Sequence, residues 1–259
     1  MAPRKAVPMA ESQTVQLSDR LGATERRDWW WLQPLVVFIG LAGFAVYATL
    51  RAFQGHFYMW GPYLSPFYSP LIDPEHHWWP LSPAVLVLGG PLGFRTTCYY
   101  YRKAYYRAFF WDPAACAVGE ARHNYRGETK FPLILQNIHR YFFYLSFVFL
   151  VSLWRDAVRG FIWKGHFGAG VGSFILLINA ALLTTYTLSC HSCRHMVGGN
   201  LDCYSCAKFG GARLSLWRRV TSLNEHHMLI AWTSLFFVAF TDLYVMLAAM
   251  GTIRDLRLF

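Results

Sequence analysis

The sequence predicts an all-α membrane protein, a polytopic bundle of five transmembrane helices. Of its 259 residues, 55% are hydrophobic and only 15% are charged, whereas charged residues make up roughly a quarter of a soluble domain. Several apolar runs approach the ~20 residues that cross a hydrocarbon core of ~30 Å. The first 29 residues are polar and charged, and the first apolar run begins too late and extends too far for a cleavable signal peptide. We therefore expect a cytoplasmic segment at 1–29 followed by one membrane domain at 30–255.

Each expected span is an apolar run bounded by aromatic or charged residues. The first opens on the aromatic belt Trp29–Trp31, and such side chains settle at membrane interfaces. Pro34 and Pro91 are compatible with spanning helices because neighbours in a bundle re-satisfy the backbone groups that a proline frees. The five spans are expected at about 30–50, 81–101, 133–154, 167–190 and 228–250.

Lysine and arginine predict the orientation of the bundle, because cytoplasmic loops carry an excess of them. Sixteen fall in segments on one side of the membrane: 1–29, 102–130 and 191–225. Six fall in segments on the other side: 51–80, 155–166 and the tail after 250. We therefore expect the N-terminus in the cytoplasm and the C-terminus outside. The net charge of +10 then lies in loops that can meet anionic lipid or an acidic partner, and nucleic-acid binding is disfavoured because no basic soluble domain is present.

Two thiols and two imidazoles lie close together at the end of the fourth expected span, in Cys190-His-Ser-Cys-Arg-His195. Soft thiolates and imidazoles suit zinc, iron or an iron–sulfur centre. On a continued helix, Cys190 and Cys193 lie about 60° apart, and His191 and His195 about 40° apart on a neighbouring arc. A Rieske-type [2Fe–2S] cluster requires this separation, with two cysteines on one iron and two histidines on the other. The predicted metal ligands are therefore Cys190, His191, Cys193 and His195.

Side chains on one convex helix diverge, so a cluster held by this stretch alone requires the helix to unwind. The following Gly198-Gly199 permits that. Otherwise another segment supplies some ligands, since the expected topology brings soft donors from four helices to the cytoplasmic face. All six cysteines lie in or beside cytoplasmic segments, where structural disulfides are disfavoured, and this favours metal binding. The alternative ligands are Cys98, Cys116, His139 and His227.

Two other centres compete with the cluster. Cys203 and Cys206 form a second Cys-x2-Cys pair, and two such pairs are a common zinc pattern, although the gap between them is short here. A bis-histidine haem b needs histidines from two helices at matching depth, which His139 and His227 provide. The alternatives to an electron-transfer subunit with a cluster are therefore a haem b quinone-reactive anchor and a zinc-stabilised membrane scaffold without redox chemistry.

Polar groups near the cytoplasmic face also indicate a quinone site. Such groups donate hydrogen bonds to a quinone carbonyl, and a nearby arginine stabilises the charge that the carbonyl gains on reduction. The aromatic run from Cys98 to Trp111 lines such a pocket or forms an interfacial belt with positive anchors. Asp242 in the fifth span is an intramembrane acid, a functional candidate by default. The residues expected to bind quinone are His139, Arg140, Tyr99 and Arg102.

Four strings of the sequence resemble the single membrane subunit of actinobacterial-type succinate dehydrogenases. They are Thr97-Cys-Tyr-Tyr-Tyr-Arg-Lys-Ala-Tyr-Tyr-Arg107, Ile134-Leu-Gln-Asn-Ile-His-Arg-Tyr-Phe-Phe143, Cys190-His-Ser-Cys-Arg-His195 with Gly198-Gly199, and Asn224-Glu-His-His-Met228. The resemblance covers about residues 30–255. It implies a five-helix anchor in the bacterial plasma membrane that assembles with a flavoprotein subunit and an iron–sulfur subunit and reduces menaquinone. It also implies a Rieske-type cluster in place of haem.

The resemblance assigns succinate oxidation to flavin in a soluble subunit, so this chain alone is not expected to oxidise succinate. A cluster at the inner membrane edge lies between that subunit and a lipid-soluble quinone, and histidine ligation raises its potential relative to all-cysteine ligation. Basic cytoplasmic loops offer a docking surface for the soluble subunits. The usual Rieske pattern resembles Cys-x-His with a distant Cys-x-x-His, and the adjacent Cys and His of this sequence depart from it. The individual ligands therefore stay open.

Overall fold

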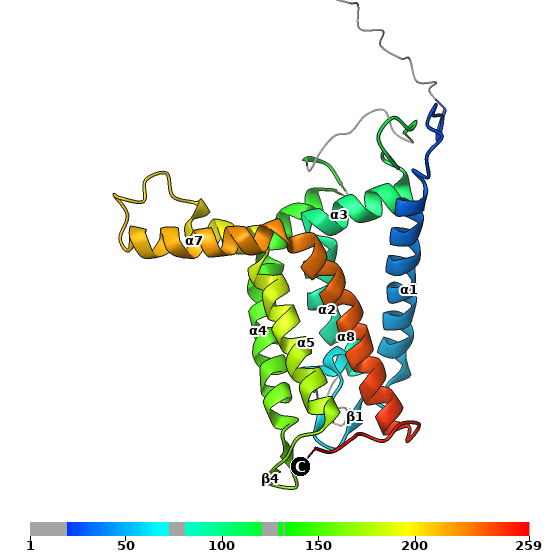
Figure 1. Ribbon diagram of the computed structural model, residues 1–259, viewed down its shortest axis with the longest axis vertical. Coiled ribbons are helices and arrows are strands. Elements are labelled where there is room, and N and C mark those ends of the chain that lie inside the picture. Colours follow the sequence, from blue (N-terminus) through cyan, green and yellow to red (C-terminus); the bar gives the residue numbers. More distant parts are fainter. Residues whose placement is uncertain (1–19, 73–80, 121–128, 132, 259) are drawn as a thin grey trace, which may run out of the picture. The chain divides into compact units, whose positions relative to one another are not determined.

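The computed structural model describes residues 20–72, 81–120, 129–131 and 133–258, which are mostly helical (Figure 1). Parts of the expected cytoplasmic segments, 1–19 and 121–128, and residues 73–80 of the expected outer loop lie outside this description. The α-helices are α1 (Leu32–Gln54), α2 (Pro83–Thr96), α3 (Tyr99–Tyr105), α4 (His139–Arg159), α5 (Val171–Leu188), α6 (His191–Arg194), α7 (Gly210–Glu225) and α8 (His227–Ala249). Shorter helical turns are η1 (Pro66–Tyr68), η2 (Tyr106–Phe110), η4 (Leu133–Ile138) and η5 (His195–Gly199).

The described strands form short antiparallel hairpins that follow long helices. In the first, β1 (Met59–Trp60) pairs with β2 (Tyr63–Leu64), and Met59 lies opposite Leu64. In the second, β3 (Ile162–Trp163) pairs with β4 (His166–Phe167), and Ile162 lies opposite Phe167. Hairpins of this length turn the chain between helices and do not build a sheet.

The chain divides into two compact units, residues 1–38 with 104–125 and residues 39–103 with 126–259. In the first unit, Gly22 N donates to Gly119 O over 3.0 Å, and Gly119 N donates to Ala23 O over 2.8 Å. The indole rings of Trp30 and Trp111 meet edge to face in the same unit, with centroids 6.1 Å apart. These contacts join the segment before α1 to the segment after η2.

In the second unit, α4 packs against α5, α5 against α8 and α2 against α4 (Figure 1). At one end of this bundle the core contains Phe94, Phe143 and Tyr186. Farther along, the core contains Leu176 and Val245. The short α6, the π-turn η5 and α7 pack together across the end at which α5 finishes and α8 begins (Figure 1).

Among the described helices, four are long and apolar enough to cross a membrane: Leu32–Gln54, Leu133–Arg159, Val171–Leu188 and His227–Ala249. They match the expected spans at 30–50, 133–154, 167–190 and 228–250. The expected span at 81–101 is not confirmed. Its helix, α2, has 14 residues, and at ~1.5 Å per residue it is shorter than the ~30 Å hydrocarbon core. A break at Thr97–Cys98 separates it from α3.

The bounds of these helices follow from local sequence chemistry. The Ser82 side chain caps α2 by accepting a hydrogen bond from Ala84 N, and Pro83 occupies the first helical position, where its missing N–H costs nothing. At the same end of the bundle, α8 ends before Gly251, whose φ of 74° is a left-handed conformation that glycine adopts readily.

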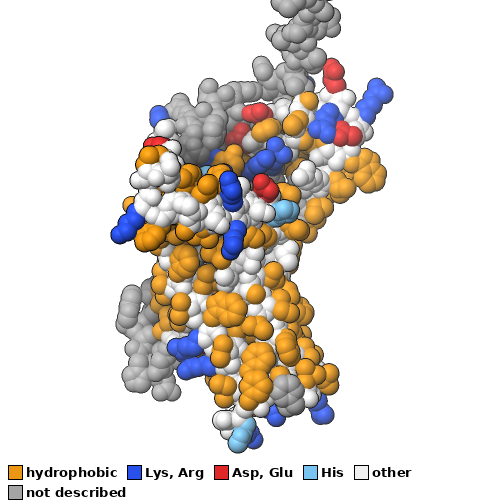
Figure 2. Space-filling model, turned by 60° about the vertical axis from the view of Figure 1, so that its left-hand side comes forward, with side chains coloured by type: hydrophobic (Ala, Val, Ile, Leu, Met, Phe, Trp, Pro, Cys, Tyr) orange, Lys and Arg blue, Asp and Glu red, His pale blue; other side chains and the backbone are white. Residues whose placement is uncertain are grey.

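The surface of α4 shows how the bundle meets lipid. Phe143, Ser146 and Leu150 are buried at helical spacing, whereas Val148 and Val151 on the opposite side are 58% and 70% exposed. Figure 2 shows hydrophobic side chains over much of the helical surface on the face drawn, with most Lys and Arg toward the helix ends. An apolar exposed surface of this kind is compatible with a hydrocarbon solvent and not with water.

Asp242 is fully buried in α8 and pairs with the buried Arg51 of α1. Arg51 Nε donates to one carboxylate oxygen over 2.7 Å, and the Tyr47 hydroxyl donates to the same oxygen over 2.5 Å. The Ser65 hydroxyl donates to the other oxygen. A buried charge needs such a set of partners. Asp242 therefore fastens α1 and the segment around Ser65 to α8.

Candidate metal centre

Cys98 and Cys190 both lie where a helix is interrupted. The link Thr97–Cys98 separates α2 from α3, and the link Ser189–Cys190 separates α5 from α6. His139 is the first residue of α4, and His227 is the first residue of α8. Helix ends therefore present all four side chains, and helix packing brings the four ends to one region of the second unit.

Each imidazole in this region contacts a thiol from another helix. His139 Nε2 lies 3.0 Å from Cys190 Sγ. His227 Nε2 lies 3.4 Å from Cys98 Sγ. The two cysteines are 4% and 2% exposed. Two buried cysteines and two partly buried histidines thus form two thiol–imidazole pairs.

The second ring nitrogen of each histidine is held by a hydroxyl group. His139 Nδ1 lies 2.9 Å from Thr97 Oγ1, and His227 Nδ1 lies 2.7 Å from Ser189 Oγ. Metal-binding histidines usually hydrogen-bond through the nitrogen that does not bind the metal, because this bond fixes the ring orientation. Each hydroxyl residue directly precedes one of the two cysteines, so the same two helix breaks position both the thiols and the imidazoles.

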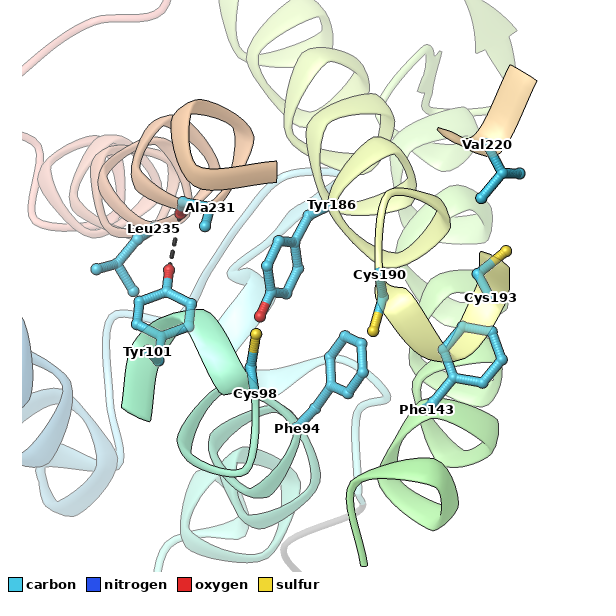
Figure 3. Close-up of a cluster of buried hydrophobic side chains, with 10 residues drawn as sticks. All are labelled: Phe94, Cys98, Tyr101, Phe143, Tyr186, Cys190, Cys193, Val220, Ala231 and Leu235. Carbon is cyan, nitrogen blue, oxygen red and sulfur yellow. Dashed lines mark hydrogen bonds between the residues drawn. The ribbon is translucent and has the colours of Figure 1, made fainter. Parts of the chain in front are cut away.

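Aromatic rings enclose the four donors. Phe94 stacks on the ring of His139 with centroids 5.0 Å apart, and Tyr186 stacks on His227 at 5.2 Å. Figure 3 shows the thiol groups of Cys98 and Cys190 directed into this enclosure, near the rings of Tyr186 and Phe94. The stacked rings fix the imidazole planes and exclude water, so the donors are preorganised for a buried group.

No three or more His, Cys, Asp or Glu side chains are arranged to hold a single metal ion in the part of the chain described. The four donors lie instead as two pairs, each drawn from two helices. A binuclear cluster spreads its ligands over two irons and so needs a wider arrangement than one ion does. Thiol and imidazole donors of this kind are ligands that zinc, iron and iron–sulfur centres use.

The four ligands predicted from the Cys190–His195 stretch are not gathered into one site. Cys190 lies in the centre just described, whereas His191 is exposed. The thiol of Cys193 lies beside Val220 and away from Cys98 (Figure 3), and its burial raises the pKa of this thiol. His195 Nδ1 lies 2.7 Å from Arg140 Nη2. The short α6 continues directly into η5, so the chain stays helical here and does not unwind to bring the four side chains together.

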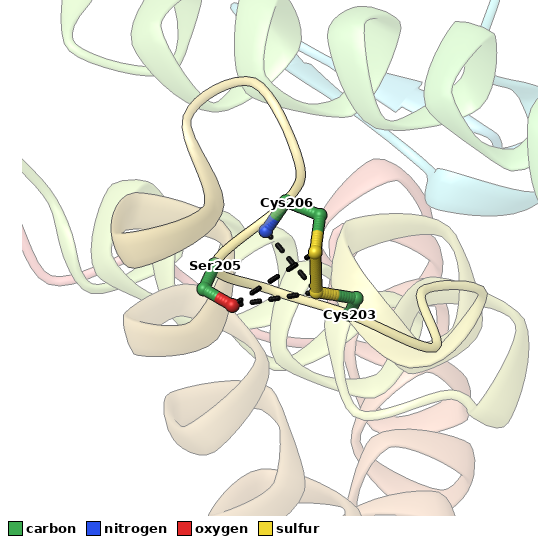
Figure 4. Close-up of a disulfide and its surroundings, with 3 residues drawn as sticks. All are labelled: Cys203, Ser205 and Cys206. Carbon is green, nitrogen blue, oxygen red and sulfur yellow. Dashed lines mark hydrogen bonds between the residues drawn. A yellow bond between two sulfur atoms is a disulfide. The ribbon is translucent and has the colours of Figure 1, made fainter.

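The remaining candidate cysteines lie elsewhere. Cys203 and Cys206 form a disulfide in the loop before α7 (Figure 4). In this structure their sulfur atoms are bonded to each other and lie outside the group of Cys98, Cys190, His139 and His227. Cys116 is exposed and belongs to the first unit. Of the alternative ligands, the structure brings Cys98, His139 and His227 together with Cys190.

The residues predicted to bind quinone lie in this centre (His139), on the surface next to it (Arg140 and Tyr99) and in a buried position (Arg102). His139 belongs to the centre. Arg140, the next residue, is exposed. Tyr99 is 67% exposed and follows Cys98 directly, and the Arg102 guanidinium lies 4.6 Å from its ring centroid. Tyr99 and Arg140 each follow one of the proposed donors in the sequence, and Arg102 contacts Tyr99.

Two further residues belong to the site without a sequence-based expectation, the partly buried Arg95 and the buried Tyr186. The Arg95 guanidinium lies 4.4 Å from the ring centroid of Tyr186 and donates to Ser234 Oγ over 3.1 Å. A signal for Arg95 was present, since an arginine inside an apolar run is costly unless it has partners. No sequence signal marks Tyr186, one tyrosine among fifteen.

Comparison with known proteins agrees with the sequence resemblance. The family model for actinobacterial succinate dehydrogenase subunit SdhC matches residues 32–251. The chain is also similar to a chain of the Mycobacterium smegmatis Sdh1 complex in the apo form, with 46% identity and a TM-score of 0.81 over 91% of this chain and 94% of that chain. No curated protein matches. The chain therefore belongs to the actinobacterial SdhC family, the membrane subunit of succinate dehydrogenase.

Proposed function

We propose that this subunit passes electrons to membrane quinone through a [2Fe–2S] cluster bound by Cys98, Cys190, His139 and His227. The observation that supports this most is the meeting of two buried thiols and two partly buried imidazoles from four separate helices. When bound, such a cluster accepts and releases one electron at a time. The residues of the chain bind it, orient its ligands and keep water away.

The proposed ligand set has the composition of a Rieske-type centre, two cysteines and two histidines. Thr97 and Ser189 hold the imidazoles with Nε2 toward the centre, so the ligands need little reorganisation on binding. Neutral imidazoles in place of two thiolates lower the negative charge of the cluster and raise its potential. A raised potential allows the site to take electrons from ordinary clusters in a soluble subunit.

Haem b and zinc are the competing centres. A bis-histidine haem requires the two imidazoles to face one iron from opposite sides of a porphyrin, whereas here each imidazole contacts a thiol. A zinc scaffold would use the same four donors around one ion. Visible absorption of the purified complex separates the three: zinc is colourless, haem gives a sharp Soret band and a cluster gives broad bands.

The proposed partners are a flavoprotein subunit, which oxidises succinate, and an iron–sulfur subunit, which delivers the electrons. The exposed Arg140 beside the centre provides positive charge for such partners, whereas Arg102 is buried. Menaquinone is proposed to bind close to the centre, because electron tunnelling requires proximity. Tyr99, Arg102, Arg140 and His139 are the proposed hydrogen-bond donors to its carbonyl groups.

Paired histidine variants of the whole complex test the proposal. His139→Ala with His227→Ala is expected to abolish the cluster absorption and quinone reduction, while succinate is still oxidised with an artificial acceptor. His191→Ala with His195→Ala is the matched control, because it removes two histidines of the neighbouring stretch that lie outside the proposed centre. If the cluster is lost in His191→Ala with His195→Ala but kept in His139→Ala with His227→Ala, the ligands lie in the Cys190–His195 stretch and the proposal is wrong.

A further inference from the structure

Among the described residues, the buried hydroxyl group of Tyr186 has the Cys98 thiol beside it and no other hydrogen-bond partner. Its side chain is 2% exposed and lies in α5, one helical turn before Cys190. Figure 3 shows the hydroxyl directed toward Cys98 Sγ. An unpaired buried donor costs free energy, and folded proteins rarely retain one. A buried hydroxyl with only a thiol beside it therefore indicates that a stronger acceptor belongs at this place.

Neighbouring side chains hold the Tyr186 ring so that the hydroxyl keeps this direction. His227 stacks on the ring at 5.2 Å with an interplanar angle of 17°. Phe94 meets the ring edge to face at 5.5 Å. The Arg95 guanidinium lies over the ring at 4.4 Å. Arg95 is itself fixed by Ser234 Oγ and by the carbonyl oxygen of Ala231, which accept from it over 3.1 and 3.3 Å.

We propose that Tyr186 donates a hydrogen bond to a sulfur atom of the bound cluster at Cys98, and that this bond raises the reduction potential of the cluster. The inference rests on the proposed function and concerns the energetics of the same centre. Hydrogen bonds to the sulfur atoms are one of the factors that set the potential of an iron–sulfur cluster. A donor favours the reduced form, because reduction adds negative charge to the sulfur atoms.

The Arg95 charge acts in the same direction. A cation over the face of the phenol ring draws electron density from it and strengthens the hydroxyl as a donor. Tyr186 keeps its proton throughout, and no bond forms or breaks when one electron from the soluble iron–sulfur subunit enters the centre. Tyr186 and Arg95 therefore bias an electron transfer without taking part in proton transfer.

An EPR-monitored redox titration of the whole complex tests the role of Tyr186. In Tyr186→Phe the cluster is expected to assemble with a lower midpoint potential. The expected weakening of electron acceptance is about tenfold, which equals about 59 mV for a one-electron couple. Tyr68→Phe is the matched control, because Tyr68 is equally buried, lies in another part of the core and donates its hydroxyl to Arg51 O over 2.8 Å. The control is expected to shift the potential less than Tyr186→Phe does.

An intact cluster with an unchanged potential in Tyr186→Phe would overturn the inference and leave the proposed function standing. A wild-type complex without a mixed Cys/His cluster would instead overturn the proposed function, before any variant is made. If Tyr186→Phe fails to assemble, a fluorinated tyrosine at position 186 keeps the shape of the side chain and is a stronger donor. It is expected to raise the potential, and an unchanged value would count against the hydrogen bond.

Discussion

His139 Nε2 lies 3.0 Å from Cys190 Sγ, although 51 residues separate the two along the chain. One residue begins α4 and the other follows the last turn of α5. The ring of His139 cannot turn away, because Thr97 Oγ1 holds its Nδ1 and Phe94 stacks on its face. The proposed ligands therefore come from helix ends that are far apart in the sequence, and not from one continuous stretch.

The cysteines of the second unit are expected to differ in their effect on iron content. Cys98→Ala and Cys190→Ala each remove a proposed ligand, so we expect loss of cluster iron, measured by iron analysis of the purified complex. Cys193→Ala removes an equally buried thiol that packs against Val220. It is expected to keep its iron and to lose only packing energy, about 1 kcal/mol. Equal iron loss in all three variants would not agree with the proposed ligand set.

The helical spans could be predicted from the sequence because apolar periodicity is a local property. The spans at 133–154, 167–190 and 228–250 correspond to α4, α5 and α8 with shifts of a few residues at their ends. The break between α2 and α3 was not predicted, because the apolar and aromatic run continues across it. Thr97 Oγ1 bonds to Gly93 O there, and such side-chain bonds to the backbone compete with a regular helix.

The donor types could also be predicted, but their grouping could not. Cys190 and Cys193 are neighbours in sequence, and helical geometry alone makes them look like one site. In the structure Cys190 lies at the N-cap of α6, where its sulfur accepts a weak hydrogen bond from Ser192 N over 3.4 Å, and Cys193 points to another part of the core. The approach of Cys98, His139 and His227 depends on how helices pack, which no local pattern encodes.

The hydroxyl groups behind the imidazoles are expected to affect cluster binding without being ligands. Thr97→Val removes the partner of His139 Nδ1 and keeps the side-chain shape. Loss of such a partner typically costs about 10- to 100-fold in metal affinity. We expect the Thr97→Val cluster to be lost faster during incubation with an iron chelator. Thr185→Val is the control, because the exposed Thr185 hydroxyl only bonds to Ala181 O of its own helix.

Asp242→Asn is expected to destabilise the protein without changing the cluster spectrum. The substitution leaves the buried Arg51 without its carboxylate partner. Breaking a buried ion pair from one side costs about 3–5 kcal/mol. A lower thermal unfolding temperature in detergent, with unchanged EPR of the folded fraction, is the expected result. A large change in quinone reduction at normal stability would point to a functional role for Asp242 instead.

Cysteine labelling of intact cells tests the predicted orientation. Met59→Cys places a thiol in the exposed part of the expected outer loop, and a membrane-impermeant maleimide is expected to label it from outside. Native Cys116 is exposed in the expected cytoplasmic loop and is expected to react only after permeabilisation. The variant for position 59 therefore also carries Cys116→Ser. The reverse labelling pattern would invert the bundle in the membrane.

Pulsed EPR of the reduced whole complex tests the central claim most directly. The account predicts a [2Fe–2S] signal with an average g value below that of all-cysteine clusters and with magnetic coupling to two histidine nitrogens. Both features are expected to be lost in His139→Ala with His227→Ala and retained in His191→Ala with His195→Ala. A wild-type signal without nitrogen coupling, or coupling that persists when His139 and His227 are both replaced, would contradict the account.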